Sequence, residues 1–481
     1  MNNIAQRIAP LLAALLLGAC STTPELKAPA LPMPSSFKEA QQPVQAADGA
    51  LWKRAQPAEA QERGQWWLAF HDADLTALID QASAANASLA VAAARVKQAR
   101  ALAGMVDADR SIQVGAGIQA QRSRASALSL GLPDGTPVAP GTAYQARLSA
   151  SYEVDLFGRL GAGVNAAQAD AAASEATYRS VLLALQADVA QTYFRIRATD
   201  AELATLRQAA DLRAQSVKVN QSRFDHGDIG EFDLVRAKGE LAAARAEEIG
   251  LQRQRVQLEH ALAVLLGKPA AMFSAGVNPL PETAQLPSIP AGLPSKLLER
   301  RPDVSAAQRA MVASNARIGV ARAAMFPSLS LSAAGGGESS ALSNVLTWSS
   351  RSWVLGALMS MPVIDGGRNK ANIARSEAVL EESVAAYRQN VLVAFADVED
   401  NLAGLRILAS QSEQVDAGVV LARRSADLAQ KLYQAGRSSY LDLLDAQRNL
   451  AGVERNAAQL RGNQAVTTVA LIRSLGGGWE N

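Results

Sequence analysis

Two aspartates and an arginine, spaced one helical turn apart, are the residues best suited to chemistry in this chain. Asp442, Asp445 and Arg448 lie in the stretch KLYQAGRSSYLDLLDAQRNL, residues 431–450. Residues three apart share one face of a helix, so the two carboxylates would project together. Such a face attracts cations and repels anions, and rings of carboxylates select ions in pores. The alternative is ordinary solvated surface charge.

The rest of the chain offers no catalytic constellation. The three histidines, His71, His226 and His260, show no metal-ligand spacing with one another, with cysteine or with paired carboxylates. Gly335–Gly337 is expected to start a loop, and no lysine-serine/threonine pair follows it, as a phosphate-binding loop requires. We therefore expect no enzyme, no metal and no cofactor besides a lipid anchor. With 47 basic and 45 acidic residues, the chain lacks the basic excess of nucleic-acid-binding proteins.

The N-terminus predicts export and lipidation. Arg7 precedes a short apolar stretch, which is typical of a signal peptide over residues 1–19. The sequence LGAC at 17–20 resembles a bacterial lipobox, in which the cysteine, here Cys20, is acylated. By analogy with lipoproteins of this kind, Ser21 rather than an aspartate after the cysteine implies sorting to the outer membrane. The alternative is a lone buried cysteine behind an ordinary signal.

The chain is an internal duplication. Adding 209 to a residue number in the first half often gives the same residue in the second, without a gap from 158 to 267. Glycines and aspartates follow this rule, so chance repetition of alanine does not explain it. The first repeat spans 75–267 and the second 295–476. A proline-rich linker, 268–294, separates them, and 477–481 is a short tail.

Each repeat predicts one very long helix and a shorter returning helix. Residues 160–222 contain no proline, and apolar residues recur every seven positions from Leu182 to Phe224. A sustained heptad pattern indicates coiled-coil packing. The returning helices are expected at 231–265 and 440–474. The turns between them form the tips, 224–233 and 433–442.

Four segments of about ten residues alternate or have the length of tilted transmembrane strands: 111–121, 144–154, 327–335 and 353–363. No apolar run after residue 20 is long enough for a transmembrane helix. Four strands leave two unpaired edges, which a bilayer does not tolerate. Two copies would give eight strands, filled by side chains, whereas three would give twelve and leave a pore. We therefore expect a trimer.

These features together resemble the outer-membrane efflux factors, the TolC-like exit ducts of tripartite pumps. The likeness is greatest to the lipoproteins that serve resistance–nodulation–division (RND) transporters, and it covers nearly the whole mature chain. Besides the lipobox and the duplication, the stretches that carry it are GQWWLAFHDADLTALI (64–79), YEVDLFGR (152–159), MPVIDGGR (361–368) and the tip sequence quoted above.

The resemblance implies a mainly α fold with a membrane β-barrel. In it, a homotrimer forms a twelve-stranded β-barrel in the outer membrane, continuous with a long α-helical barrel in the periplasm. Residues 20–74 would form a lipid-anchored tether and equatorial segment, and 268–294 the rest of that belt. The partners would be a periplasmic adaptor and an RND-type inner-membrane transporter, with small toxic molecules as cargo. A duct for type I protein secretion and a lipid-anchored coiled-coil scaffold without a pore are the alternatives.

The resemblance also implies a periplasmic gate at the tips. Its aspartates match Asp442 and Asp445, its aromatic residue matches Tyr433, and either Arg437 or Arg448 matches its arginine. Arg236 occupies the place in the first repeat that Asp445 occupies in the second, so the two carry opposite charges suited to pairing across an interface. The adaptor contacts are expected at the tips; the residues are Phe224, Gly227, Gly436 and Arg437.

Overall fold

The computed structural model describes residues 22–26, 34, 36–40, 64–284, 286–287, 289 and 300–477. The expected signal peptide and Cys20 lie outside these residues. The chain divides into two compact units. The first comprises Met1–Ala30, Val96–Ser174 and Ala307–Tyr387, and the second comprises Leu31–Arg95, Glu175–Ala306 and Arg388–Asn481.

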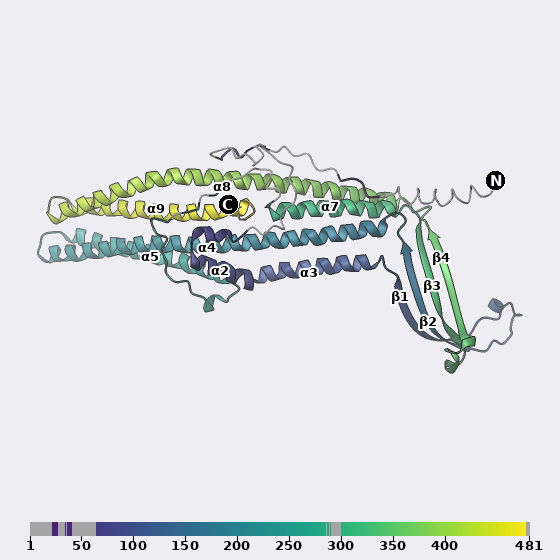
Figure 1. Ribbon diagram of the computed structural model, residues 1–481. Coiled ribbons are helices and arrows are strands. Elements are labelled where there is room, and N and C mark those ends of the chain that lie inside the picture. Colours follow the sequence, from purple (N-terminus) through teal and green to yellow (C-terminus); the bar gives the residue numbers. More distant parts are fainter. Residues whose placement is uncertain are drawn as a thin grey trace. The chain divides into compact units, whose positions relative to one another are not determined.

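Helices and strands follow the order expected for two copies of one unit (Figure 1). The first copy contains α2 (Ala73–Ala85), α3 (Ala87–Ala108), β1 (Gln113–Ser123), β2 (Gly141–Val154), α4 (Arg159–Asp225) and α5 (Glu231–Leu265). The second contains α7 (Pro302–Ala323), β3 (Ser328–Ser339), β4 (Arg351–Ser360), α8 (Arg368–Gln434) and α9 (Tyr440–Ser474). Short 3-10 turns lie at Trp66–Phe70, Leu128–Leu130, Ala270–Met272, Leu342–Asn344 and Trp348–Ser350.

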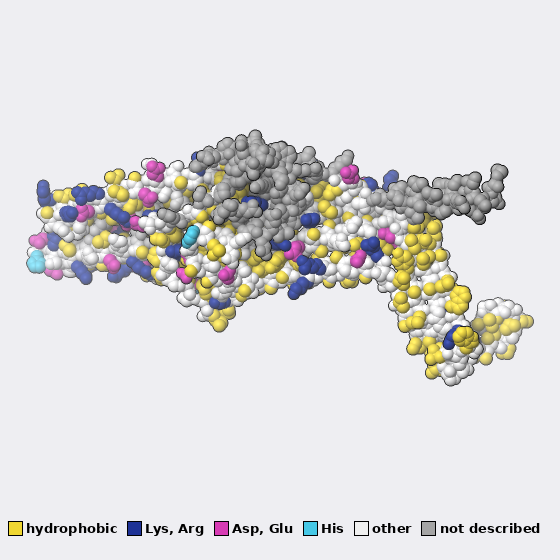
Figure 2. All heavy atoms as spheres, in the orientation of Figure 1, with side chains coloured by type: hydrophobic (Ala, Val, Ile, Leu, Met, Phe, Trp, Pro, Cys, Tyr) yellow, Lys and Arg dark blue, Asp and Glu magenta, His cyan; other side chains and the backbone are white. Residues whose placement is uncertain are grey.

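The first unit contains one sheet of four antiparallel strands in the order β1-β2-β3-β4. The outer edges of β1 and β4 therefore have no partner strand among the residues that the structure describes. Every residue of β1 and of β4 is exposed. Figure 2 shows many hydrophobic and few charged side chains over the strands, whereas charged side chains are frequent over the helices.

The pairing register sorts the side chains of this sheet into two faces. Successive residues of a strand point to opposite faces, and directly paired residues share a face. One face is mostly apolar, with polar residues only at its loop end, and includes Val114, Ile118, Leu148, Tyr152, Leu331, Trp353 and Leu355. The opposite face is rich in polar and small residues and includes Gln113, Gln119, Gln145, Arg147, Ser149, Ser330, Ser332 and Glu338.

The expectation that Gly335–Gly337 starts a loop is wrong, because these glycines lie inside β3 and pair with β2 and β4. The lack of a side chain is required at Gly336 and Gly337. A Cβ on Gly336 would lie 2.0 Å from the Ala146 carbonyl oxygen, and one on Gly337 would lie 1.7 Å from the Val345 carbonyl oxygen. A glycine in a strand often marks such a close backbone approach.

Each strand-to-helix joint is fixed by an aspartate. Asp155 accepts hydrogen bonds from the backbone N–H groups of Leu160 (3.0 Å) and Gly161 (2.7 Å) in the first turn of α4. Asp365 accepts bonds from Gly367 and Asn369, both 2.9 Å, at the start of α8. The first-turn N–H groups lack helical partners and favour a carboxylate. The motifs YEVDLFGR and MPVIDGGR are therefore two versions of one joint.

The N-terminal segment 22–26 lies against α7 and the joint before α4. The Thr22 hydroxyl donates hydrogen bonds to the carbonyl oxygens of Phe157 (3.0 Å) and Gly319 (3.1 Å). Asn315 donates to the carbonyl of Pro24 at 2.9 Å. Gly319 makes room for this segment, because a Cβ there would lie 2.1 Å from the Thr23 hydroxyl oxygen.

The duplication is reproduced to the residue in the helices. α4 and α8 each have 67 residues, α5 and α9 each have 35, and all four pairs of bounds differ by 209. At about 1.5 Å per residue, α4 and α8 are each on the order of 100 Å long. None of the helices in the described ranges has a stretch long and apolar enough to span a bilayer.

The heptad row of α4 is largely buried in the second unit. Val189, Ile196, Leu203 and Ala210 are all buried, as are Val391, Val398 and Val419 in α8. The main core of this unit joins Trp66, Trp67, Leu75 and Ile79 to α4, α5 and α9.

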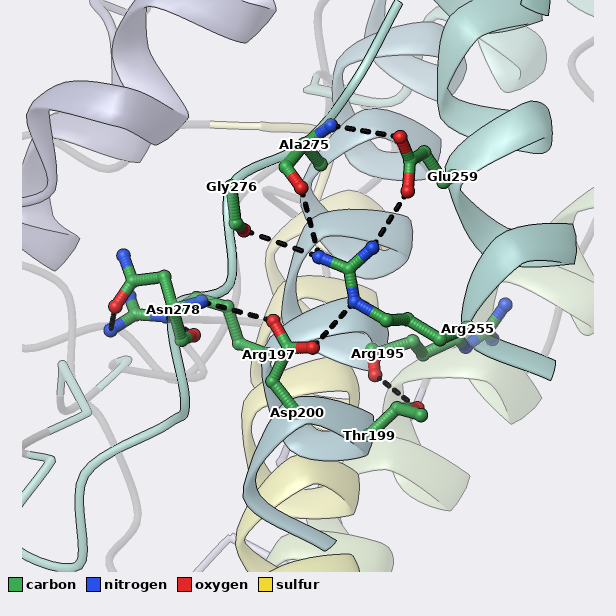
Figure 3. A network of polar contacts seen from close by, with 9 residues as sticks. All are labelled: Arg195, Arg197, Thr199, Asp200, Arg255, Glu259, Ala275, Gly276 and Asn278. Atoms are coloured by element: carbon green, nitrogen blue, oxygen red, sulfur yellow. Dashed lines mark hydrogen bonds and ion pairs between the residues drawn. The ribbon is translucent and has the colours of Figure 1, made fainter. Parts of the chain in front are cut away.

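A buried ion-pair network fixes the linker against α4 and α5 (Figure 3). Arg255 donates to Asp200 (Nε–Oδ1, 2.6 Å) and to Glu259 (Nη1–Oε2, 2.6 Å), and also to the Ala275 carbonyl at 2.9 Å. Asp200 and Glu259 accept the backbone N–H groups of Asn278 (3.0 Å) and Ala275 (3.1 Å). Only 1% of the Asp200 side chain is exposed. The start of the linker is therefore held by a buried cluster of charges whose members all have hydrogen-bond partners.

Candidate functional site at the helix turns

The two helix turns have the same backbone conformation. Gly227 and Gly436 have φ angles of 82° and 68°, in the left-handed region that favours glycine. In both turns the glycine N–H bonds three residues back, and the next N–H bonds five residues back, which is the Schellman arrangement. The predicted reversal of the chain at these two glycines therefore has a specific local cause.

The returning helices begin differently. Ser439 caps α9: its hydroxyl accepts the Asp442 N–H at 3.2 Å, while the Asp442 carboxylate accepts the Ser439 N–H at 3.0 Å and its hydroxyl at 2.7 Å. This capping box satisfies two N–H groups of the first turn. The corresponding residue before α5 is Gly230, which has no side chain to cap with.

The capping box also stabilises the ionised form of the Asp442 carboxyl group. Hydrogen bonds from the Ser439 hydroxyl and N–H stabilise the carboxylate and hold the pKa of Asp442 below its ordinary value. Asp445 is exposed as well, at 64% of its side chain, and has Arg448 4.0 Å away. The two aspartates thus lie on one helix start, but Asp442 is engaged in the cap and Asp445 is not.

Tyr433 lies buried between the two turns. Its hydroxyl donates to Asn220 Oδ1 at 2.6 Å, which links α8 to α4. The Arg223 guanidinium lies 5.3 Å from the centre of the Tyr433 ring, a cation–π distance. The ring also packs in a small core with Tyr440 and Leu443. Tyr433 therefore connects the two repeats through a polar contact inside an apolar cluster.

Arg448 reaches the other repeat rather than only its own helix. It pairs with Glu240 of α5, with Nε–Oε2 at 3.1 Å. The hydrogen bond to Glu240 raises the pKa of Arg448. Of the two candidate arginines, Arg437 is exposed near the turn, and Arg448 is the one that bridges the repeats.

The structure thus brings Tyr433 and Arg448 to contacts between repeats, whereas Arg236 is half-buried on α5 and Phe224 remains partly exposed at the end of α4. Sequence reasoning missed three partners: Asn220, Arg223 and Glu240. A signal for Glu240 was present, because Glu240 and Glu247 are seven apart, as are Arg448 and Arg455. The described part of the chain holds no cluster of three or more histidines, cysteines and acids placed for a metal ion.

Comparisons with known proteins agree with this architecture. The family described as "Outer membrane efflux protein" matches residues 78–268 and 293–477. The outer membrane protein OprJ of Pseudomonas aeruginosa is 34% identical over 100% of this chain and 97% of its own length. The toluene efflux pump outer membrane protein TtgI of Pseudomonas putida is also 34% identical, over 98% of each chain.

A solved structure agrees as well. The open state of the MtrE outer membrane channel of Neisseria gonorrhoeae superposes with a TM-score of 0.81 at 27% identity, covering 95% of this chain and 98% of that one.

These matches confirm the expected mainly helical fold with four strands and the expected outer-membrane location. They also confirm that the chain is of the efflux-channel type. Two family matches cover nearly all of both repeats, and relatives align from end to end. The chain belongs to the outer membrane efflux protein family.

Proposed function

We propose that this chain is the outer-membrane exit duct of a tripartite efflux pump and that it works as a homotrimer. The two-faced sheet with unpaired edges supports this most directly. An apolar face suits lipid and a polar face suits a water-filled interior. Both free edges must be paired inside a membrane, and three copies give twelve strands around a pore.

The other members of the pump are a periplasmic adaptor and an RND-type transporter of the inner membrane. The helix turns, with Phe224, Gly227, Gly436 and Arg437, are the surface for the adaptor. The cargo class is small toxic molecules, which agrees with toluene efflux in the name of TtgI. A protein-secretion duct is the competing function; its loss would change the secreted proteins, whereas loss of a drug duct changes sensitivity to drugs and solvents.

Assembly is tested on the purified chain in detergent. Light scattering should give the mass of three copies, and planar bilayers should show single-channel currents. A stable single copy without currents would overturn the duct. A pore-free scaffold would behave in that way.

The lipid anchor is tested at Cys20. Thr22 and Pro24 are held on α7, close in the chain to this cysteine. Cys20→Ala should abolish incorporation of labelled palmitate, while the chain still requires detergent because of its strands. Solubility of Cys20→Ala without detergent would favour the scaffold.

The gate consists of Asp442, Asp445 and Tyr433, with Arg448 and Arg236 as charged partners. Asp442→Ala with Asp445→Ala should raise single-channel conductance and reduce cation selectivity, because the carboxylates are lost. Since Asp442 also caps α9, Ser439→Ala is the matched control: it disturbs the cap and keeps both charges. Unchanged conductance and selectivity in the double variant would remove the gate assignment.

A further inference from the structure

The apolar face of the sheet contains an open hollow near the loops. Its volume is about 700 Å³, which lies within the range of ligand pockets. By the pairing register, small residues of that face form its floor and larger side chains stand beside them. The small residues are Ala116, Ala146, Gly335 and Gly337, and the larger ones are Ile118, Leu148 and Trp353. The hollow therefore opens to the surroundings on the apolar side of the sheet.

The loop between β3 and β4 covers one end of this hollow. Val345 and Leu346 of the loop line it. Only a glycine at position 337 admits the loop, because a Cβ there would collide with the Val345 carbonyl oxygen. In the register, Gly337 lies on the same face as Ala146 and Arg351. The loop therefore folds over the apolar face of the sheet and not over the polar face.

The charges of the apolar face are all positive, and they lie at its loop end. Among the paired residues of the four strands, that face carries two charged side chains, Arg122 of β1 and Arg351 of β4. The strand carboxylates Glu153 and Glu338 belong to the opposite face. Neither guanidinium forms an ion pair within the described residues. This end of the apolar face is therefore complementary to anions.

Arg351 is positioned at the edge of the hollow with its donors free. It lines the hollow, and its guanidinium lies 4.0 Å from the centre of the Trp348 ring. Stacking on an aromatic face leaves the N–H groups at the edge of the guanidinium available, and their planar fork matches the oxygens of a phosphate group. Trp353, two residues along the same face, is 78% exposed. Because exposed tryptophans of membrane strands lie where lipid tails meet headgroups, Arg351 lies at headgroup level.

The loop end of the sheet belongs to the outer leaflet of the membrane. Residues 124–140 and 340–350 connect the strands at the end opposite the joints to α4 and α8. Since the helices extend into the periplasm, these connections face the cell exterior. The lipid of this leaflet carries several acyl chains on a phosphorylated sugar headgroup. An apolar hollow beside a cation without a partner is complementary to both parts of such a lipid.

We propose that the hollow and Arg351 form a binding site for the phosphorylated glycolipid of the outer leaflet. One acyl chain lies in the hollow, where its methylene groups contact apolar side chains. A phosphate group accepts charge-assisted hydrogen bonds from Arg351. The proposal rests on the membrane barrel of the duct proposed above and adds a site for a lipid rather than for exported cargo. The bound lipid also holds the β3–β4 loop, because Val345 and Leu346 line the same hollow.

Native mass spectrometry of the full-length trimer in detergent tests the site. The probe is lipid A, the acylated and phosphorylated part of this glycolipid, added either with its phosphates or after enzymatic dephosphorylation. The phosphorylated form should bind saturably, with one molecule per chain. The dephosphorylated form should bind about fivefold more weakly, because one arginine beside an anionic lipid contributes roughly that factor. Equal binding of the two forms, or equal binding of phosphatidylethanolamine, would overturn the proposal.

The headgroup contact is tested at Arg351. Arg351→Gln should weaken binding of phosphorylated lipid A about fivefold and leave binding of the dephosphorylated form unchanged. Arg351→Lys keeps the charge but loses the planar fork, so its affinity should lie between those of the wild type and Arg351→Gln. Arg253→Gln removes an exposed arginine from α5 and is the control for net charge. An equal loss in Arg253→Gln would reveal unspecific attraction and overturn the role of Arg351.

The acyl-chain position is tested at Gly335. A Cβ there would meet its nearest neighbours at 3.9 Å, an ordinary contact distance, so a leucine enters the hollow without straining the sheet. Gly335→Leu should weaken binding of both forms of lipid A by a similar factor. Ala357→Leu adds the same side chain to the same face outside the hollow and should have no effect. Unchanged binding in Gly335→Leu would overturn the placement of the chain in the hollow.

Light scattering and channel currents of the same preparations separate this proposal from the duct. A wild type that is neither trimeric nor conducting overturns the duct and the lipid site together. A trimeric and conducting wild type that does not distinguish the two forms of lipid A overturns the lipid site alone.

Discussion

The two repeats share their backbone and differ in the side chains that use it. Both helix turns reverse at a glycine with positive φ and the same pair of backbone hydrogen bonds. Around that common frame, Gly230 corresponds to Ser439, Phe224 to Tyr433 and Arg236 to Asp445. At these positions the second turn therefore has a cap, a buried hydroxyl and an exposed acid, whereas the first has glycine, phenylalanine and arginine.

This difference indicates how a duplicated hairpin acquires two roles. Residues that fix φ angles cannot change without strain, so both copies retain them. Side chains beside them are free to diverge once the frame exists. In the first repeat, the buried Arg255 and its acidic partners hold the linker. In the second repeat, polar side chains instead cap the helix and link the two repeats at the turn. Replacing a residue of one repeat by its equivalent in the other tests what each of these differences contributes.

The largest effect is expected at Arg255. Its equivalent in the second repeat is Gln464, and the equivalent of its partner Asp200 is Ala409. Arg255→Gln leaves Asp200 buried without its cation, which costs about 3 kcal/mol or more of unfolding free energy. Thermal and denaturant unfolding in detergent measure it. Arg207→Gln is the control, because its pair with Glu248 is half exposed and contributes under about 1 kcal/mol. Equal losses in both variants would contradict the buried clamp.

Tyr433→Phe should have the next largest effect, because phenylalanine occupies the equivalent position in the first repeat. The change removes the donor to Asn220 Oδ1, an acceptor on a fully buried residue. An unsatisfied buried acceptor costs about 1–3 kcal/mol. Tyr440→Phe alters the neighbouring ring of the same small core and should cost less. If the two variants are equally stable, the Tyr433–Asn220 bond does not hold the repeats together.

The cap at Ser439 should have a smaller effect. Ser439→Ala removes the hydroxyl that accepts the Asp442 N–H and costs about 1 kcal/mol, whereas Ser439→Gly, which copies the first repeat, costs only a few tenths. Hydrogen exchange of the first turn of α9 should increase in the alanine variant. The matched change Gly230→Ser in the first repeat should slow exchange at the start of α5. No change at either helix start would show that the caps are without effect.

The smallest effect is a pH dependence of that cap. The pKa of Asp442 is lowered in the folded chain, so its contribution to stability is present above the ordinary value of 3.8. It is lost as pH falls below 3.8 through the folded value, because the protonated carboxyl group accepts the Ser439 hydrogen bonds more weakly than the carboxylate does. The difference in stability between wild type and Asp442→Asn should therefore shrink under acid. A difference that grows as pH falls would have the wrong sign.

The long helices could be predicted from the sequence because their signals are local. The glycines that end α4 and α8, the heptad rows and the 209-residue offset gave the returning helices at 231–265 and 440–474, where the structure has them. The alternation of β1 and β2 likewise indicated strands. The loop predicted at Gly335–Gly337 was wrong because glycine usually signals a turn. In β3, Gly336 and Gly337 are instead needed because the carbonyl oxygens of Ala146 and Val345 approach the backbone closely.

The partners at the turns could not be predicted in the same way. Asn220 and Glu240 lie 213 and 208 residues from Tyr433 and Arg448. Whether such residues meet depends on the rotation of each helix about its axis, and a single sequence does not fix that rotation. The types of residue at the candidate site were therefore visible in advance, but their pairing within one chain was not.

The unpaired edges of the sheet have a consequence for biogenesis. A newly exported copy presents bare backbone donors and acceptors along β1 and β4 beside an apolar face. Such edges recruit other strands indiscriminately, and misassembly is the result when correct partners are scarce. Insertion and association must accordingly be one event, so the yield of working protein should depend on the local supply of copies. Overproduction faster than the membrane accepts them would end in aggregates rather than in stored single chains.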